Sequence, residues 1–348
     1  MIDSIKIIQP DDWHVHFREG EMLSVITKYS SRVNKRCIAM PNTSKPITTS
    51  IEAVNYKKLI EDNSDNDNFE ALIPCYLTDS LNVADFEYAL QNNIFIGGKL
   101  YPNNATTNSQ FGVNDIKQIY NIFEILEKYN KTLLIHGELN RSDIDIFDRE
   151  KYFIDEELQQ IRESFTDLKI VLEHVSSDYG VDFVKTNNNI AGTITPHHML
   201  LTKKDVFKDE IINPHHYCMP VVKNENDLLS LRKAACFNNS KFFLGTDSAP
   251  HHVDHKKQND SLKAGIFSSS NSIELYALIF EEENALENLE VFSSINGPKF
   301  YDMDVNRHYL TLNKEDRIIP EYIEEGNIKI KNFYANKNIN WKASQLHV

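Results

Sequence analysis

The stretch "IFIGGKLYPNNATTN" (residues 94–108) is an apolar run that ends in two glycines and a lysine, followed by an uncharged loop. A short apolar run bounded by turn residues is typical of a buried strand. A lysine at its end must either reach solvent or serve a site. Seven other runs have the same form, rich in Val, Ile, Leu and Phe with polar residues at the end: DDWHVHF (11–17), RCIAMPN (36–42), EALIPCYLT (70–78), TLLIHGE (132–138), KIVLEHVS (169–176), IAGTITPHH (190–198) and KFFLGTDSAPH (241–251).

Amphipathic segments lie between these runs. The clearest is 113–130, where apolar residues recur at the spacing of a one-sided helix. Similar patterns predict helices over 50–63, 83–93, 153–166, 179–187, 225–238 and 271–296. Eight strands that alternate with helices predict a single (β/α)8 barrel of the TIM type. A doubly wound open sheet is the structural alternative, but it usually needs fewer strands.

The predicted domain organisation is one barrel domain over residues 1–348. The barrel spans about 11–296, and a C-terminal extension, about 297–348, packs on it. Strand and helix signals weaken in this extension, and it carries no recognisable chemistry.

Composition excludes several classes of protein. The chain has 348 residues, 41% of them hydrophobic, and a formal net charge of −14, so it lacks the basic patch of a nucleic-acid binder. The amino-terminal residues show no secretory leader, and no apolar run is long enough to cross a membrane, which favours a cytoplasmic protein. Four scattered cysteines without C-x-x-C spacing predict reduced core thiols.

The ends of the predicted strands carry the candidate chemistry. His14 and His16 lie two residues apart on one strand, so both imidazoles can face the barrel axis and share a metal ion. The remaining strand ends add one candidate each: Lys99, His136, His174 and Asp247. His and Asp are seldom buried without a partner, so this set predicts a metal site. Zinc suits such ligands best, although nickel, cobalt or manganese could bind them.

The motifs DDWHVHFREG, AMPNTSKP, GGKLYPNNATTNS, LIHGE, LEHVSS, GTITPHH and FLGTDSAPH occur in this order, and "NGPKFY" (296–301) follows. Together they resemble the class II dihydroorotases of the amidohydrolase superfamily, over residues 11 to about 300. The resemblance implies two divalent metal ions. His14, His16 and Asp247 would bind the first, and His136 and His174 the second. Lys99 would be N-carboxylated by carbon dioxide and bridge both.

The implied reaction is the reversible cyclisation of N-carbamoyl-L-aspartate to L-dihydroorotate in pyrimidine synthesis, with Asp247 as the general base and acid. Both compounds carry a carboxylate that does not react. Arg18 faces the same side as His16 and can bind a carboxylate with two hydrogen bonds, with Asn42 and His251 as companions. By resemblance the substrate also contacts His136, Met219 and Ala264. The resemblance further suggests a homodimer.

The loop 103–112 is expected to act as a lid whose Thr106 and Thr107 reach the bound substrate. Phe17, Glu19, His252 and Asp254 depart from the family pattern, which puts only fine substrate geometry in doubt. The histidine pairs 197–198 and 215–216 are interpreted as structural. Two alternatives stay open: another binuclear cyclic-amide hydrolase, such as a hydantoinase or allantoinase, or a catalytically inactive scaffold.

Overall fold

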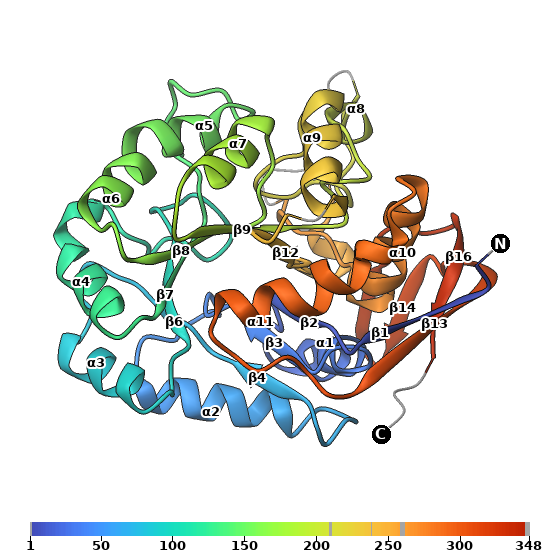
Figure 1. The fold of residues 1–348 in the computed structure, drawn as a ribbon, viewed down its shortest axis with the longest axis horizontal. Coiled ribbons are helices and arrows are strands. Elements are labelled where there is room, and N and C mark those ends of the chain that lie inside the picture. Colours follow the sequence, from blue (N-terminus) through green and yellow to red (C-terminus); the bar gives the residue numbers. More distant parts are fainter. Residues whose placement is uncertain (1, 209–210, 238, 258–261, 345–348) are drawn as a thin grey trace.

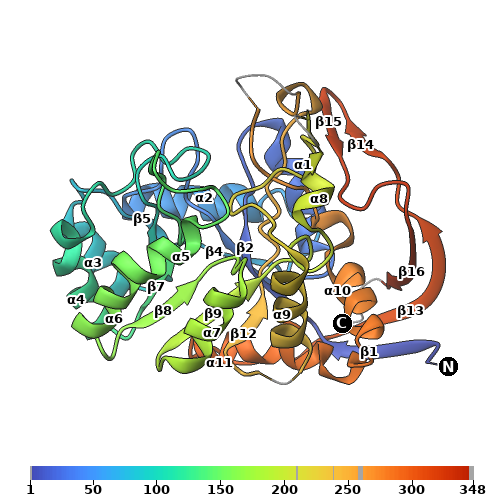
Figure 2. The same ribbon diagram turned by 90° about the horizontal axis from the view of Figure 1, so that it is seen from above.

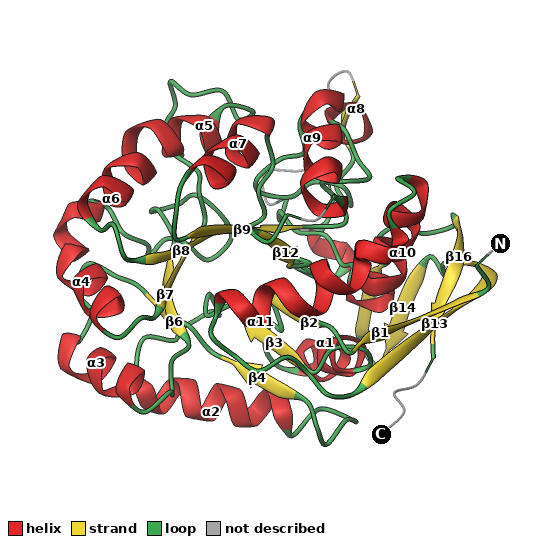
Figure 3. Ribbon diagram, viewed as in Figure 1, coloured by secondary structure: helices red, strands yellow, loops and turns green. Residues whose placement is uncertain are grey.

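The computed structural model describes residues 2–208, 211–237, 239–257 and 262–344. Its centre is a ring of parallel strands surrounded by helices (Figure 3), which confirms the predicted (β/α)8 barrel. The barrel strands are β2 (Asp11–Val15), β3 (Arg36–Ala39), β4 (Glu70–Leu72) with β5 (Cys75–Tyr76), β6 (Gly97–Leu100), β7 (Thr132–Ile135), β8 (Lys169–Leu172), β9 (Ile190–Ile194) and β12 (Phe242–Leu244). Each of the eight predicted runs contains one barrel strand, with β4 and β5 counted together as the third.

The third barrel strand is divided into two pieces. β4 pairs with β3, whereas β5 pairs with β6, and Pro74 lies between the pieces. Proline has no backbone N–H to donate to a neighbouring strand. The break therefore falls where the sequence cannot continue the hydrogen-bonded ladder.

Backbone hydrogen bonds between the first and the last barrel strands close the ring. The Asp247 N–H donates to the His14 carbonyl (2.9 Å), and the His16 N–H donates to the Ser248 carbonyl (3.0 Å). The side chain of Asp12 also accepts from the Thr246 hydroxyl (2.6 Å) and from the Thr246 N–H (2.9 Å). The closure thus brings together the two segments that carry predicted metal ligands.

Helices cover the outside of the barrel (Figures 1 and 2). They are α1 (Glu21–Ser31), α2 (Ser50–Glu61), α3 (Val83–Gln91), α4 (Tyr120–Lys128), α5 (Arg149–Phe153), α6 (Gln159–Ser164), α7 (Asp178–Thr186), α9 (Glu225–Cys236), α10 (Ser272–Glu282) and α11 (Asn296–Phe300). The loop after β9 adds α8 (Lys203–Val206) and the short strands β10 (Phe207–Lys208) and β11 (Ile211–Ile212). No helix in the described ranges is long and apolar enough to cross a membrane.

Two helical segments differ from the sequence prediction. The helix α1 was not predicted. The single segment 271–296 was wrong as one helix, because α10 ends at Glu282 and Asn284 takes a positive φ of 54°. A short 3-10 turn, a π-helical turn and then α11 follow this break.

The C-terminal region forms strands beside the barrel. β13 (Tyr309–Ile318) pairs antiparallel with β16 (Asn338–Ala343) and with the N-terminal strand β1 (Ser4–Ile8). Figure 1 shows this sheet, with the blue N-terminal strand beside the red C-terminal strands. A separate hairpin consists of β14 (Tyr322–Glu325) and β15 (Ile328–Lys331).

The barrel interior is filled by side chains from nearly every strand. This cluster contains Trp13, Ile38, Met40, Leu72, Leu134, Val171, Ala191, Phe243 and Tyr301. Trp13 stacks on Tyr301, which follows α11, with ring centroids 4.5 Å apart. Gly297 lets α11 approach Trp13 closely, since a Cβ atom there would lie 1.9 Å from Trp13 Nε1.

We expect Gly297→Ala to lower the free energy of unfolding by about 1–3 kcal/mol, because the added methyl group would overpack the contact between α11 and Trp13. Denaturant unfolding followed by circular dichroism measures this change. Lys299→Ala is the control, since Lys299 is exposed on the same helix. Equal unfolding midpoints for the two variants would show that α11 does not need the close approach.

Candidate metal centre and substrate pocket

The first strand presents two histidines to the mouth of the barrel. His14 Nδ1 lies 2.8 Å from a Glu173 oxygen, and His16 Nδ1 lies 2.9 Å from the Asn42 side-chain oxygen. Both acceptors require the proton on Nδ1, so in the neutral rings Nε2 carries the lone pair. Both Nε2 atoms face the same Asp247 oxygen, at 3.3 and 3.0 Å.

The charges of this first group are set by burial and by the pairing. Burial lowers the pKa of His16 to about 4, which leaves its imidazole neutral near pH 7. Burial alone would raise the pKa of Asp247, but the neighbouring His14 and His16 rings hold it well below its usual range. A cation bound between a carboxylate and two imidazole nitrogens would stabilise this arrangement.

A second pair of histidines lies across the barrel mouth. His136 Nε2 donates to Glu138 (3.0 Å), so its Nδ1 carries the lone pair, and this atom lies 3.1 Å from His174 Nε2. His174 Nδ1 is buried and has no hydrogen-bond partner among the described residues. Burial and the charge of His136 lower the pKa of His174 well below its usual value. His174 therefore offers a neutral nitrogen donor beside His136.

Lys99 points into the barrel between these two groups. It pairs in register with Leu134, a member of the interior cluster, and its side chain is fully buried. Its Nζ has no hydrogen-bond partner in the described part of the chain and lies 5.2 Å from the centre of the Tyr101 ring. Burial lowers the pKa of Lys99 to about 8, although the charges of Glu173 and Asp247 oppose the shift. A fraction of the amine is thus unprotonated near neutral pH.

The donor set fits two divalent cations. It combines four imidazoles, one carboxylate and a buried amine, and it includes no thiolate. Two unpartnered nitrogens, on Lys99 and His174, are buried beside it. Buried polar atoms without partners are rare in native structures, and bound ions are one explanation for them.

A cavity with an empty volume of about 340 Å³ opens beside these donors. The residues predicted from the sequence that line it are His14, His16, Arg18, Asn42, Thr106, Thr107, His136, His174, Met219, Asp247 and Ala264. Lys99 lies buried behind the cavity, and His251 reaches it through Arg18 and Ala264. The structure thus brings together all the predicted site residues.

Arg18 and His251 form one side of this cavity. His251 Nε2 lies 2.9 Å from the Ala264 carbonyl, to which it must donate, so it cannot also accept from Arg18 Nη2 at 3.2 Å. Arg18 Nε donates to the Pro250 carbonyl, which fixes the plane of the guanidinium. The Nη2 end has no acceptor among the described residues and remains available to a carboxylate.

The loop 103–112 lies over the cavity and contacts both walls. Asn42 Nδ2 donates to the Thr107 carbonyl (3.0 Å), and Asn108 donates to the Asn42 carbonyl (3.0 Å). The Thr107 hydroxyl lies 3.4 Å from the Ala264 carbonyl. In this structure the loop therefore adopts a closed position.

Sequence reasoning missed three side chains that support the site. Glu173 and Glu138 orient His14 and His136, and Tyr101 lines the cavity with a buried hydroxyl that has no partner among the described residues. An acidic residue next to a predicted ligand, as in "LEHVSS", was a usable signal for Glu173. Partners of this kind fix the tautomer of a metal-binding histidine.

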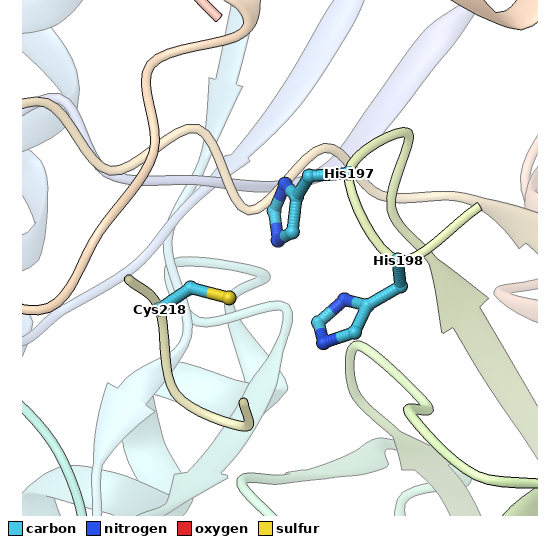
Figure 4. A group of neighbouring side chains, drawn as sticks. All are labelled: His197, His198 and Cys218. Carbon is cyan, nitrogen blue, oxygen red and sulfur yellow. The ribbon is translucent and has the colours of Figure 1, made fainter. Parts of the chain in front are cut away.

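A second group of possible ligands consists of His197, His198 and Cys218, whose side chains face one another (Figure 4). Both nitrogens of His198 are engaged, by the Thr195 hydroxyl (2.7 Å) and by the Pro220 carbonyl (3.0 Å). The Cys218 thiol also donates to the Pro220 carbonyl. Through these contacts His198 and Cys218 hold the 217–220 segment in place. No lone pair of His198 is left for a metal.

Comparisons with known proteins agree with the fold and show the family. Residues 6–308 match the model of the amidohydrolase family. A dihydroorotase of Buchnera aphidicola is 40% identical over 99% of both chains, and one of Photorhabdus laumondii is 42% identical over 97% of both. The crystal structure of dihydroorotase in complex with 5-fluoroorotic acid from Saccharomyces cerevisiae superimposes with a TM-score of 0.93, at 33% identity and 99% coverage of both chains.

More distant structures show the same fold. The L-hydantoinase of Arthrobacter aurescens superimposes with a TM-score of 0.79 at 13% identity, and this chain covers 84% of it. The full-length similarity lies with the dihydroorotases. The chain belongs to the dihydroorotase family of metal-dependent amidohydrolases, which hydrolyse carbon–nitrogen bonds in cyclic amides.

Proposed function

We propose that this chain catalyses the reversible cyclisation of N-carbamoyl-L-aspartate to L-dihydroorotate, with loss of water, in pyrimidine biosynthesis. The observation that carries the proposal is a cavity lined by the histidine and aspartate donors together with Arg18, whose Nη2 end is free. The donors suit hydrolysis of a cyclic amide, and the guanidinium suits a substrate with an additional carboxylate. A hydantoin has no such carboxylate, so Arg18 favours dihydroorotate over the hydantoinase alternative.

In this proposal His14, His16 and Asp247 would hold one divalent cation and His136 and His174 another, with zinc as the expected metal. Lys99 would serve both as an anion, the carbamate that forms when its neutral amine adds carbon dioxide and releases a proton. The low pKa of Lys99 supports this step, because the reaction needs the neutral amine. When bound, the cations polarise the ring carbonyl and increase the acidity of water.

Asp247 moves the proton. In the hydrolytic direction its carboxylate takes a proton from the attacking water as the new C–O bond forms. It then gives this proton to the ring nitrogen as the C–N bond breaks. Its pKa, held well below the usual range, keeps the carboxylate ionised and able to accept a proton, and its position beside both His14 and His16 supports this role.

The substrate carboxylate binds away from the reacting bond. Arg18 Nη2 and the side chain of Asn42 face it, and His251 holds the Ala264 segment beside it. Met219 and Ala264 complete the wall. Thr106 and Thr107 cover the substrate from the closed loop, which excludes water from the reaction. We also propose that the protein is cytoplasmic and forms a homodimer. Sedimentation at micromolar concentration tests the dimer.

The first prediction concerns Lys99. Lys99→Ala should lower kcat by more than about 10³-fold and reduce the bound metal below two ions per chain, because the bridging anion is lost. Metal is counted by mass spectrometry, and 13C-bicarbonate should give a carbamate resonance in the wild-type protein alone. A fully metallated and active Lys99→Ala would contradict the bridging role.

The second prediction concerns Arg18. Arg18→Met should raise KM for dihydroorotate roughly 10- to 100-fold, since a hydrogen bond to a charged group contributes about 1.5–3 kcal/mol. Arg141→Met is the matched control, because Arg141 is exposed and pairs with Glu156 on the surface. Wild-type turnover of dihydroorotate should also exceed that of a neutral hydantoin. A preference for the hydantoin would support the hydantoinase alternative instead.

The third prediction concerns the loop 103–112. Thr107→Val should weaken binding of 5-fluoroorotic acid roughly 3- to 10-fold, as expected for one neutral hydrogen bond. Hydrogen exchange of the loop amides should slow when this ligand binds to the wild-type protein. Gln110→Ala is the control in the same loop, because Gln110 is exposed. Identical exchange with and without ligand would show that the loop is not a lid.

A further inference from the structure

Lys256 is a buried lysine outside the predicted site. Its side chain is 4% exposed, and it lies in the segment that follows the eighth barrel strand. Its ammonium donates to three backbone carbonyls, those of Lys263 (2.8 Å), Gly265 (2.8 Å) and Tyr217 (3.2 Å). One side chain therefore connects two segments that are far apart in the sequence.

These two segments form one wall of the cavity. The carbonyls of Lys263 and Gly265 flank Ala264, and Tyr217 lies two residues before Met219. Both Ala264 and Met219 line the cavity. The Gly265 N–H also donates to the Tyr217 carbonyl (2.9 Å). The hydrogen bonds of Lys256 therefore add to a direct hydrogen bond between the two segments.

The same wall lies beside the free end of Arg18. The Ala264 carbonyl accepts from His251, which approaches Arg18 Nη2. The Ala264 segment thus meets Arg18 through His251, on the side of the cavity where a guanidinium is available to a carboxylate.

The charge of Lys256 is costly where it lies. Burial, with a smaller contribution from the positive charge of Arg18, lowers its pKa to about 7. None of the carboxylates in the described ranges forms an ion pair with its Nζ. A neutral donor could bind the same carbonyls without the cost of burying a charge. A cation at this position becomes favourable when an anion occupies the cavity.

We propose that Lys256 is a positioning residue for the substrate carboxylate, which holds the Ala264 and Met219 wall in place and adds positive charge behind Arg18. The inference rests on the proposed function, because it assigns Lys256 to the carboxylate end of that substrate. It adds a determinant of substrate preference that does not touch the reacting bond.

Lys241 provides a matched control. Its Nζ also donates to three backbone carbonyls, those of Val184 (3.0 Å), Lys185 (3.0 Å) and Asn187. It precedes β12 at the opposite end of the barrel, and its acceptors lie at the C-terminal end of α7. Loss of Lys241 removes a similar set of hydrogen bonds without a change near the cavity.

The test compares Lys256→Met, Lys256→Gln, Lys256→Arg and Lys241→Met, each as the metal-loaded protein. Calorimetry measures binding of 5-fluoroorotic acid, and initial rates give kcat and KM for dihydroorotate. We expect Lys256→Met and Lys256→Gln to bind at least tenfold more weakly and to raise KM by a similar factor, with kcat changed less than threefold. Lys256→Arg should recover most of the affinity, and Lys241→Met should bind as the wild type does.

Binding by Lys256→Gln within threefold of the wild type would overturn the proposal, as would an equal loss in Lys241→Met. If Lys256→Met fails to fold, which circular dichroism detects, Lys256→Gln and Lys256→Arg decide the outcome. Equal loss of binding in both would show that a retained positive charge does not restore binding, which contradicts the role of the charge. A wild-type protein that neither binds 5-fluoroorotic acid nor turns over dihydroorotate would refute the proposed function itself. Normal wild-type activity with unaffected Lys256 variants would refute only this inference.

Discussion

The closure of the barrel between its first and eighth strands is the constraint on which the site depends. Asp12 accepts two hydrogen bonds from Thr246, and backbone bonds join His14 to Asp247 and His16 to Ser248. These contacts place Asp247 beside both histidines of the first strand. Without this closure the carboxylate and the imidazoles would belong to separate edges of an open sheet, and no shared cation site would exist.

Three residues of the site have strained backbone conformations. Arg18, His174 and Asp247 all have positive φ angles, of 63°, 41° and 44°. Residues other than glycine rarely adopt this conformation, and it costs about 1–3 kcal/mol where it occurs. Each of these residues lies two or three positions after a barrel strand, and each lines the cavity.

Much of this arrangement was predictable from the sequence, for identifiable physical reasons. Period-two alternation placed His14 and His16 on one face, and the common edge of parallel strands placed Lys99, His136, His174 and Asp247 together. The helix α1 was missed because its β-branched and serine residues have weak helix propensity and its N-cap residue, Gly20, provides no side-chain cap. The helical break at Asn284 had a local signal, since asparagine can end a helix with a positive φ. The sequence offered a signal for Glu173, but its pairing with His14 joins two strands far apart in the sequence, which a local pattern does not encode.

The pairing of β1 with β13 joins segments from the two ends of the chain. Ser4 lies opposite Asn313, so β1 pairs with a strand about 300 residues later in the sequence. The sheet that they form with β16 contains none of the barrel strands. Closing a loop of this length costs little more entropy than closing one of half the size. The outer sheet thus links two segments that are distant in the sequence, and the hydrogen bonds between the barrel strands do not depend on it.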